Sequence, residues 1–86
     1  MPNAPEHWIQ KTASLEREFA FADFKAALAY VNAVGELAES ADHHPDILIH
    51  GFNKVRLTLT THDEDGVTDA DHQLAAAINT LPATGS

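Results

Sequence analysis

Residues 54–61 alternate apolar and polar side chains more regularly than any other part of this chain of 86 residues. Val55, Leu57 and Leu59 are apolar, whereas the residues between them are charged or carry hydroxyl groups. Because successive side chains of a strand point to opposite faces, this period of two predicts a strand with one apolar and one polar face. Such a strand needs neighbouring strands and an apolar layer against one side.

The segment before it predicts two more strands and a helix. Residues 7–12 and 15–21 read as the strands of one hairpin, although Arg17 interrupts the apolar side of the second. Asp23 is a candidate N-cap for a helix that runs to about Ser40, in which Gly35 costs about 1 kcal/mol relative to alanine. The apolar residues of this helix recur at steps of three and four and are predicted to form one face: Phe24, Ala27, Leu28, Val31, Val34, Leu37 and Ala38.

The helix is predicted to end at residues 42–45, because Pro45 forces the residue before it out of the helical region. Residues 46–50 then read as a short strand, and Thr68 begins a second helix. The apolar stripe of that helix is Leu74, Ala75, Ile78 and Leu81. The element order ββαββα predicts an α+β fold, a four-stranded antiparallel sheet with two helices packed on one face.

Length and composition bound the class of protein. We expect one domain over residues 1–86, with loose tails at residues 1–5 and 82–86. Thirteen acidic residues against five basic ones give a formal charge of −8, which argues against binding to nucleic acid or to anionic membranes. No cysteine is present for disulfides, thiolate zinc sites or thiol nucleophiles. With no signal peptide and no apolar run of about 18–20 residues, we expect a soluble cytoplasmic protein.

Three of the six histidines fall in an ordered pattern. Glu39 stands four positions before His43, which opens an intact His43-His44-Pro45; Phe52 follows after a short strand, and His62 and Asp71 come later. In order and spacing this pattern resembles the pterin-4a-carbinolamine dehydratase family. The resemblance covers most of the chain from residue 19 onward and is densest over residues 41–75. One departure is a slightly longer link at residues 49–51, which we interpret as a loop variation.

The resemblance implies a lyase that dehydrates 4a-hydroxytetrahydropterin, left behind by an aromatic amino acid hydroxylase, to a quinonoid dihydropterin. Water loss delivers a proton to the 4a hydroxyl group and removes one from a ring nitrogen, and imidazole, with a pKa of about 6.5, suits both steps. By resemblance, His43 and His62 act as the acids, and His44 binds the pterin and takes part as the base. The substrate-binding residues that it implies are His44, Pro45, Phe52, Asp71 and Glu39.

The resemblance also bears on cofactors and partners. It implies no metal or redox cofactor, because the lone pair of the adjacent ring nitrogen can expel the hydroxyl group. It implies a pterin as the small-molecule partner and self-association into a homodimer or homotetramer. Relatives of the family also act without catalysis, as a dimerisation cofactor for a transcription factor or as an assembly helper for a large enzyme. Partner binding of that kind is the alternative function.

Several of these residues also have a purely structural interpretation. The His-His-Pro segment can serve as a helix stop, where the helix dipole favours a cation. His62 suits a turn, and Phe52 suits the core. Thr68 and Asp71 have the spacing of a capping box, in which the carboxylate reaches back to the start of its helix, and this role is compatible with a catalytic one.

A metal site is the remaining alternative for a histidine-rich chain without cysteine. His43, His44 and His62 could provide three imidazole ligands, joined by Asp71 or Glu39. Adjacent histidines seldom converge on one ion without a tight turn, and Pro45 keeps His44 extended. The spacing therefore argues against a metal site, and acid–base chemistry is what the family resemblance implies.

Overall fold

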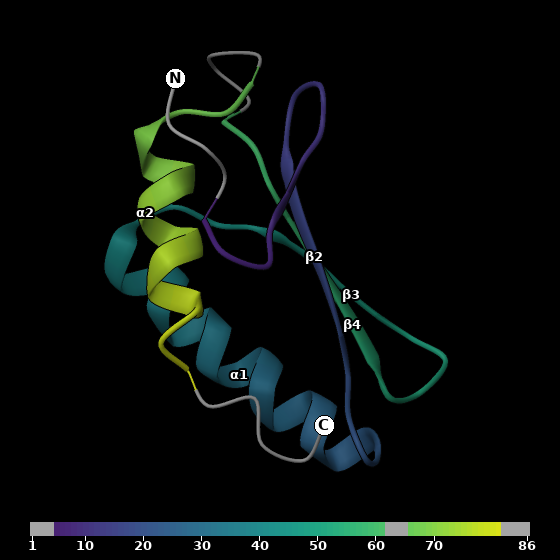
Figure 1. The fold of residues 1–86 in the computed structure, drawn as a ribbon. Coiled ribbons are helices and arrows are strands. Elements are labelled where there is room, and N and C mark those ends of the chain that lie inside the picture. The colour runs from purple at the N-terminus through teal and green to yellow at the C-terminus, as the bar shows by residue number, and fades with distance from the viewer. Residues whose placement is uncertain (1–4, 62–65, 82–86) are drawn as a thin grey trace.

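The computed structural model describes residues 5–61 and 66–81, and these form a sheet of four strands with two helices (Figure 1). In chain order the elements are β1 (Ile9–Gln10), β2 (Leu15–Ala20), α1 (Phe24–Ala41), β3 (Asp46–His50), β4 (Lys54–Leu59) and α2 (Asp69–Ile78). The sheet order is β1-β2-β4-β3, and every neighbouring pair is antiparallel. The predicted α+β fold with the order ββαββα is confirmed.

The core lies between the sheet and the helices. Leu15, Val55, Leu57 and Leu59 come from β2 and β4 and are fully buried. They pack in one cluster with buried residues of both helices. Figure 1 shows the two helices on the same side of the strands. Glu16, Glu18 and Arg56, by contrast, have the opposite parity and lie on the other face of the sheet. The period of two in the sequence therefore marks the buried face correctly.

Three strands are shorter than predicted, β2 only by one residue because it ends at Ala20. The first spans Ile9–Gln10 instead of residues 7–12, because His7 has a left-handed backbone (φ 74°) and the Lys11 amide bonds to the Ser14 carbonyl in the turn. The fourth ends at Leu59, and beyond it Thr61 forms an isolated bridge with Gly66. The predicted tails lie almost wholly outside the described residues.

Arg17 does not disrupt the core side of β2, because its charge has partners. Its guanidinium group lies 4.2 Å from the centroid of the Phe19 ring and donates a hydrogen bond of 2.5 Å to Oδ1 of Asn79. The same oxygen accepts a bond of 2.9 Å from the Trp8 indole. Burial of this arginine stem is thus compensated by a cation–π contact and a hydrogen bond.

Helix α1 begins as predicted, because Asp23 accepts a hydrogen bond of 2.8 Å from the Ala26 amide. Its buried face, however, is narrower than predicted. The buried residues are Ala27, Tyr30, Val34 and Ala38, whereas Phe24 is 49% and Leu28 is 40% exposed. At about 100° per residue, Leu28 lies roughly 120° around the axis from Val34, too far to reach the same sheet.

Helix α2 starts after Thr68 with the predicted capping box and ends at Ile78. Leu81, predicted as part of its stripe, lies beyond the helix but packs against the core. Neither of the helices described is long and apolar enough to cross a membrane.

Candidate functional site

The histidine pair is positioned by a sharp backbone turn at the end of α1. Asp42 adopts a left-handed conformation with φ 52°, and its amide donates to the carbonyl groups of Ala38 and Glu39. The His43 amide also bonds to the Ala38 carbonyl, at 3.1 Å. These bonds satisfy carbonyl groups that the helix leaves open at its end. The chain therefore leaves α1 abruptly, and His43 and His44 meet different neighbours.

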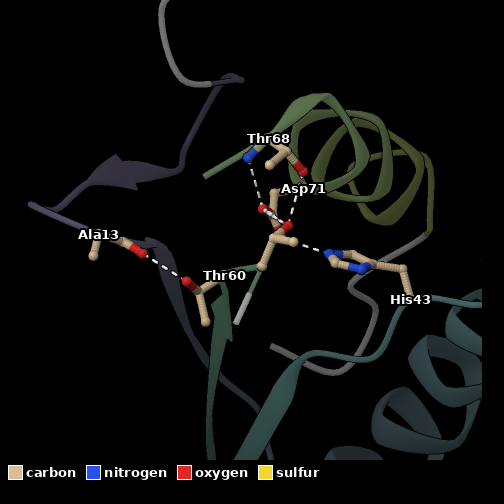
Figure 2. Close-up of polar contacts among 6 residues, drawn as sticks. Ala13, His43, Thr60, Thr68 and Asp71 are labelled. Atoms are coloured by element: carbon tan, nitrogen blue, oxygen red, sulfur yellow. Dashed lines mark hydrogen bonds and ion pairs between the residues drawn. The ribbon is translucent and has the colours of Figure 1, made fainter. Parts of the chain in front are cut away.

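His43 contacts the buried carboxylate of Asp71, which stands in the first turn of α2 (Figure 2). The distance from His43 Nε2 to Asp71 Oδ1 is 2.5 Å, and the exposed side-chain fractions are 18% for the imidazole and 0% for the carboxylate. The other oxygen, Oδ2, accepts hydrogen bonds from the Thr61 hydroxyl at 2.7 Å and from the Thr68 amide at 2.9 Å. Asp71 therefore joins three segments: the end of α1, the chain after β4, and α2.

The environment of Asp71 favours its ionised form. Burial raises the pKa of this carboxyl group, but hydrogen bonds from His43, the Thr68 amide and Thr61 outweigh burial and hold the pKa below its ordinary value. An ionised carboxylate only accepts hydrogen bonds, so His43 must donate through Nε2. Its Nδ1 is then the ring nitrogen left for chemistry.

His44 has a different setting. Its Nε2 lies 2.5 Å from Oε2 of Glu39, and both side chains are exposed, by 57% and 78%. The pair borders a hollow of about 440 Å³ between α1 and the start of β3, which Pro45 and Ile47 also line. His43 instead borders a largely apolar hollow of about 260 Å³ between α1 and α2. In the described part of the chain, the adjacent histidines thus face separate hollows.

One predicted site residue, Phe52, is not brought to these pairs within one chain. Phe52 stands in the turn between β3 and β4, 63% exposed and with a left-handed backbone of φ 57°. It follows His50, at the end of β3 away from His43, so its assignment to the core is wrong and its role in pterin binding stays a prediction. His62 lies outside the described residues.

Among residues 5–61 and 66–81, no three histidine, aspartate or glutamate side chains come together as a possible metal site. The capping interpretation of Asp71, by contrast, is confirmed, since the Thr68 amide donates to its carboxylate. The same carboxylate also contacts His43, so capping and contact with an imidazole coexist in one side chain.

Sequence reasoning missed the contact of Thr61 with Asp71. It also missed the hydrogen bond between the Thr68 and Thr61 hydroxyl groups. The Thr61 hydroxyl lies 2.7 Å from Asp71 Oδ2 and 2.8 Å from the Thr68 hydroxyl. Its parity offered a signal, because Thr61 continues the inward-facing series of Val55, Leu57 and Leu59. A polar residue at the inward position of a strand end is a candidate for contact with a buried polar group.

Comparison with known sequences gives consistent matches over most of the chain. The model of the family described as Pterin 4 alpha carbinolamine dehydratase matches residues 2–81. A candidate pterin-4-alpha-carbinolamine dehydratase 2 of Gloeobacter violaceus is 57% identical over 65 residues, which are 76% of this chain and 70% of that protein. A candidate dehydratase of the same description from Acidobacterium capsulatum is 51% identical over 74 residues, 86% of this chain and 79% of that protein.

Two solved structures share the fold. One is a crystal structure described as a transcriptional coactivator/pterin dehydratase from Brucella melitensis. It has a TM-score of 0.78 and 34% identity, and the match covers 86% of this chain and 80% of that one. The other is a pterin dehydratase-like protein identified as a RuBisCO assembly factor in the alpha-carboxysome. Its TM-score is 0.73 at 26% identity, and the match covers 95% of both chains.

Proposed function

Because this chain belongs to the pterin 4 alpha carbinolamine dehydratase family, we propose that it dehydrates 4a-hydroxytetrahydropterin to quinonoid dihydropterin. The reaction would return a pterin cofactor spent by an aromatic amino acid hydroxylase. Its product differs from its substrate by one water molecule, so proton transfer is the chemistry that the protein has to supply. Histidine is the side chain whose ordinary pKa lies nearest to neutrality.

The buried pair of His43 and Asp71 is the observation that carries the proposal. A structural helix stop needs no carboxylate, yet here a buried one contacts the imidazole and accepts two further hydrogen bonds, from Thr61 and the Thr68 amide. Asp71 fixes the ring orientation and leaves Nδ1 of His43 to exchange a proton. A general acid or base held in this way contributes about 10²–10⁴-fold to a rate.

The remaining roles follow the family pattern. As an imidazolium, His43 delivers its Nδ1 proton to the departing 4a hydroxyl group and returns to the neutral form with its hydrogen on Nε2. His62 acts as an acid at the same hydroxyl group, while His44 binds the pterin and accepts the ring proton. Glu39, which contacts His44, and Pro45, which borders the same hollow, contribute to binding of the polar pterin edge. Phe52 contributes a ring for stacking on the pterin. The lone pair of the ring nitrogen expels the hydroxyl group, so no metal or redox cofactor is needed.

The test is to replace His43, His44 and His62 singly with alanine and to measure dehydration of the carbinolamine. We expect each variant to lose about 10²–10⁴-fold in turnover because a proton donor, acceptor or binding group is lost. His72→Ala is the matched control, since His72 has no assigned role, and should keep full turnover. Treatment with a chelator should also leave turnover unchanged. Folded variants at all three positions with wild-type turnover would refute the proposal.

Self-association into a dimer or tetramer accompanies this proposal. Phe24 and Leu28 expose 49% and 40% of their surface on the side of α1 turned away from the core. Covering such residues against another copy removes apolar surface from water. Sedimentation at micromolar concentration should give a species of two or four chains, and a monomer there would contradict this part of the proposal.

A partner-binding role is the second candidate, favoured by the same exposed side chains of α1. One structural neighbour is described as a transcriptional coactivator as well as a dehydratase, and another as an assembly factor. Capture of one specific client from the native host by a chain without dehydratase turnover would favour this function. Substitution of Phe24 by serine should then abolish capture, whereas His43→Ala should not.

A further inference from the structure

The Asp71 carboxylate has two more hydrogen bonds than its capping role requires, one with His43 and one with Thr61. A capping box needs only the bond from the Thr68 amide, which reaches Oδ2 at 2.9 Å. The Thr61 hydroxyl donates to the same oxygen at 2.7 Å, from a different segment of the chain. Two donors on Oδ2 leave Oδ1 as the oxygen that faces His43, at 2.5 Å.

The charge of Asp71 decides which groups donate and which accept in this hydrogen-bond network. A carboxylate without a proton can only accept, so the Thr61 hydroxyl must donate to it. Its oxygen is then free to accept from the Thr68 hydroxyl, 2.8 Å away. The three groups form one directed chain of hydrogen bonds, which ends on the carboxylate and strengthens it as an acceptor for His43.

The backbone of Thr61 is itself held in place. Its amide donates to the Gly66 carbonyl at 2.8 Å and its carbonyl accepts from the Gly66 amide at 3.3 Å. The inward parity inherited from β4 turns its side chain toward α2. Thr60, the preceding residue, has the opposite parity and bonds instead to the Ala13 carbonyl at 2.7 Å (Figure 2).

We propose that Thr61 is a positioning residue for His43: its hydroxyl holds the Asp71 carboxylate in place, so that the neutral imidazole carries its hydrogen on Nε2 and offers Nδ1 to the substrate. The effect on catalysis rests on the proposed dehydratase function, whereas the effect on the imidazole does not. Thr61 acts through Asp71 and needs no contact of its own with the pterin.

The experiment compares Thr61→Val, Thr61→Ser and Thr60→Val in the full chain. Nitrogen-15 NMR of the histidine rings, above the pH at which imidazole titrates, reports which ring nitrogen carries the hydrogen. We expect the Nε2–H form of His43 in the wild type and in Thr61→Ser, and a shift toward the Nδ1–H form in Thr61→Val. Thr60→Val loses a hydroxyl next in the chain but not this network, so it should match the wild type.

Turnover provides the second measurement. Thr61→Val should lower kcat about 10-fold, with a smaller effect on KM, and Thr61→Ser should restore it. A folded Thr61→Val with unchanged His43 tautomer would overturn the positioning role. A changed tautomer with unchanged kcat in an active enzyme would overturn its part in catalysis.

The unmodified protein supplies a test that no folding defect can obscure. An Nδ1–H tautomer of His43 in the wild type would overturn the inference. A wild type without any dehydratase turnover would remove the proposed function, while the tautomer change in Thr61→Val would still support the positioning role.

Discussion

Replacement of Asp71 by asparagine removes one charge and turns one of the two accepting oxygens into an NH2 donor, with almost no change of shape. The carboxylate accepts three hydrogen bonds, from His43, Thr61 and the Thr68 amide, and its side chain is fully buried. A hydrogen bond to a charged group stabilises by about 1.5–3 kcal/mol and one between neutral groups by about 0.5–1.5 kcal/mol. The difference, about 1 kcal/mol per bond, suggests that Asp71→Asn lowers the free energy of unfolding by roughly 2–4 kcal/mol.

Such a loss is large for a chain of this size, whose expected free energy of unfolding is roughly 4–13 kcal/mol. Urea unfolding at neutral pH, followed by the fluorescence of the single, buried Trp8 and by circular dichroism, measures it directly. Asp69→Asn is the matched control, because Asp69 lies in the same first turn of α2 but is exposed. It should lose only the dipole contribution of about 0.3–1 kcal/mol. Equal losses in both variants would refute the reasoning.

The pH dependence has a definite sign. The pKa of Asp71 in the folded protein lies below its ordinary value, since its hydrogen bonds favour the ionised form more than burial disfavours it. Its contribution to stability is therefore fully present above the unfolded pKa of about 3.9 and is lost as the pH falls through the lower, folded pKa. The stability gap between the wild type and Asp71→Asn should narrow over that acid range. A gap that widens there would contradict the assignment.

Three further outcomes test the fold around the site. Leu57→Ala should lower the free energy of unfolding by about 2–5 kcal/mol, measured by urea unfolding, because Leu57 is fully buried. An equal loss in Leu48→Ala, on the exposed face of the sheet, would contradict this. Asp42→Gly should raise the unfolding midpoint or leave it unchanged, since glycine adopts φ 52° without strain, whereas a clear loss would show that the Asp42 side chain matters. The pKa of Glu18 is lowered by its hydrogen bond from His50, so carbon-13 NMR should show a higher Glu18 pKa in His50→Ala, and no rise would contradict that contact.

The sheet and its buried face were open to prediction because they depend on local periodicity. In β4 the alternation about Val55, Leu57 and Leu59 assigns each side chain to one face, and the structure follows it residue by residue. The start of α1 at Asp23 and the capping box of α2 were also readable, since both depend on residues within one turn. The outer limit of the α1 face was not readable, because apolar Phe24 and Leu28 lie beyond the arc that meets the sheet.

The candidate site was readable only in part. The order and spacing of the residues from Glu39 to Asp71 indicated the family. Which imidazole meets which carboxylate could not be read, because His43 and Asp71 are 28 positions apart in the chain and meet only where α2 packs beside the end of α1. The hydrogen bond from Thr61 to Asp71 was not predicted for the same reason.

The chain alone determined the order of its strands and helices and which strand side chains are apolar, because each of these depends on residues near one another in sequence. Packing decided the rest. The left-handed turn at Asp42 sends His43 to a buried carboxylate and His44 to an exposed one, so identical neighbouring side chains acquire different surroundings. The difference arises because hydrogen bonding and access to water are set by segments that only the folded chain brings together.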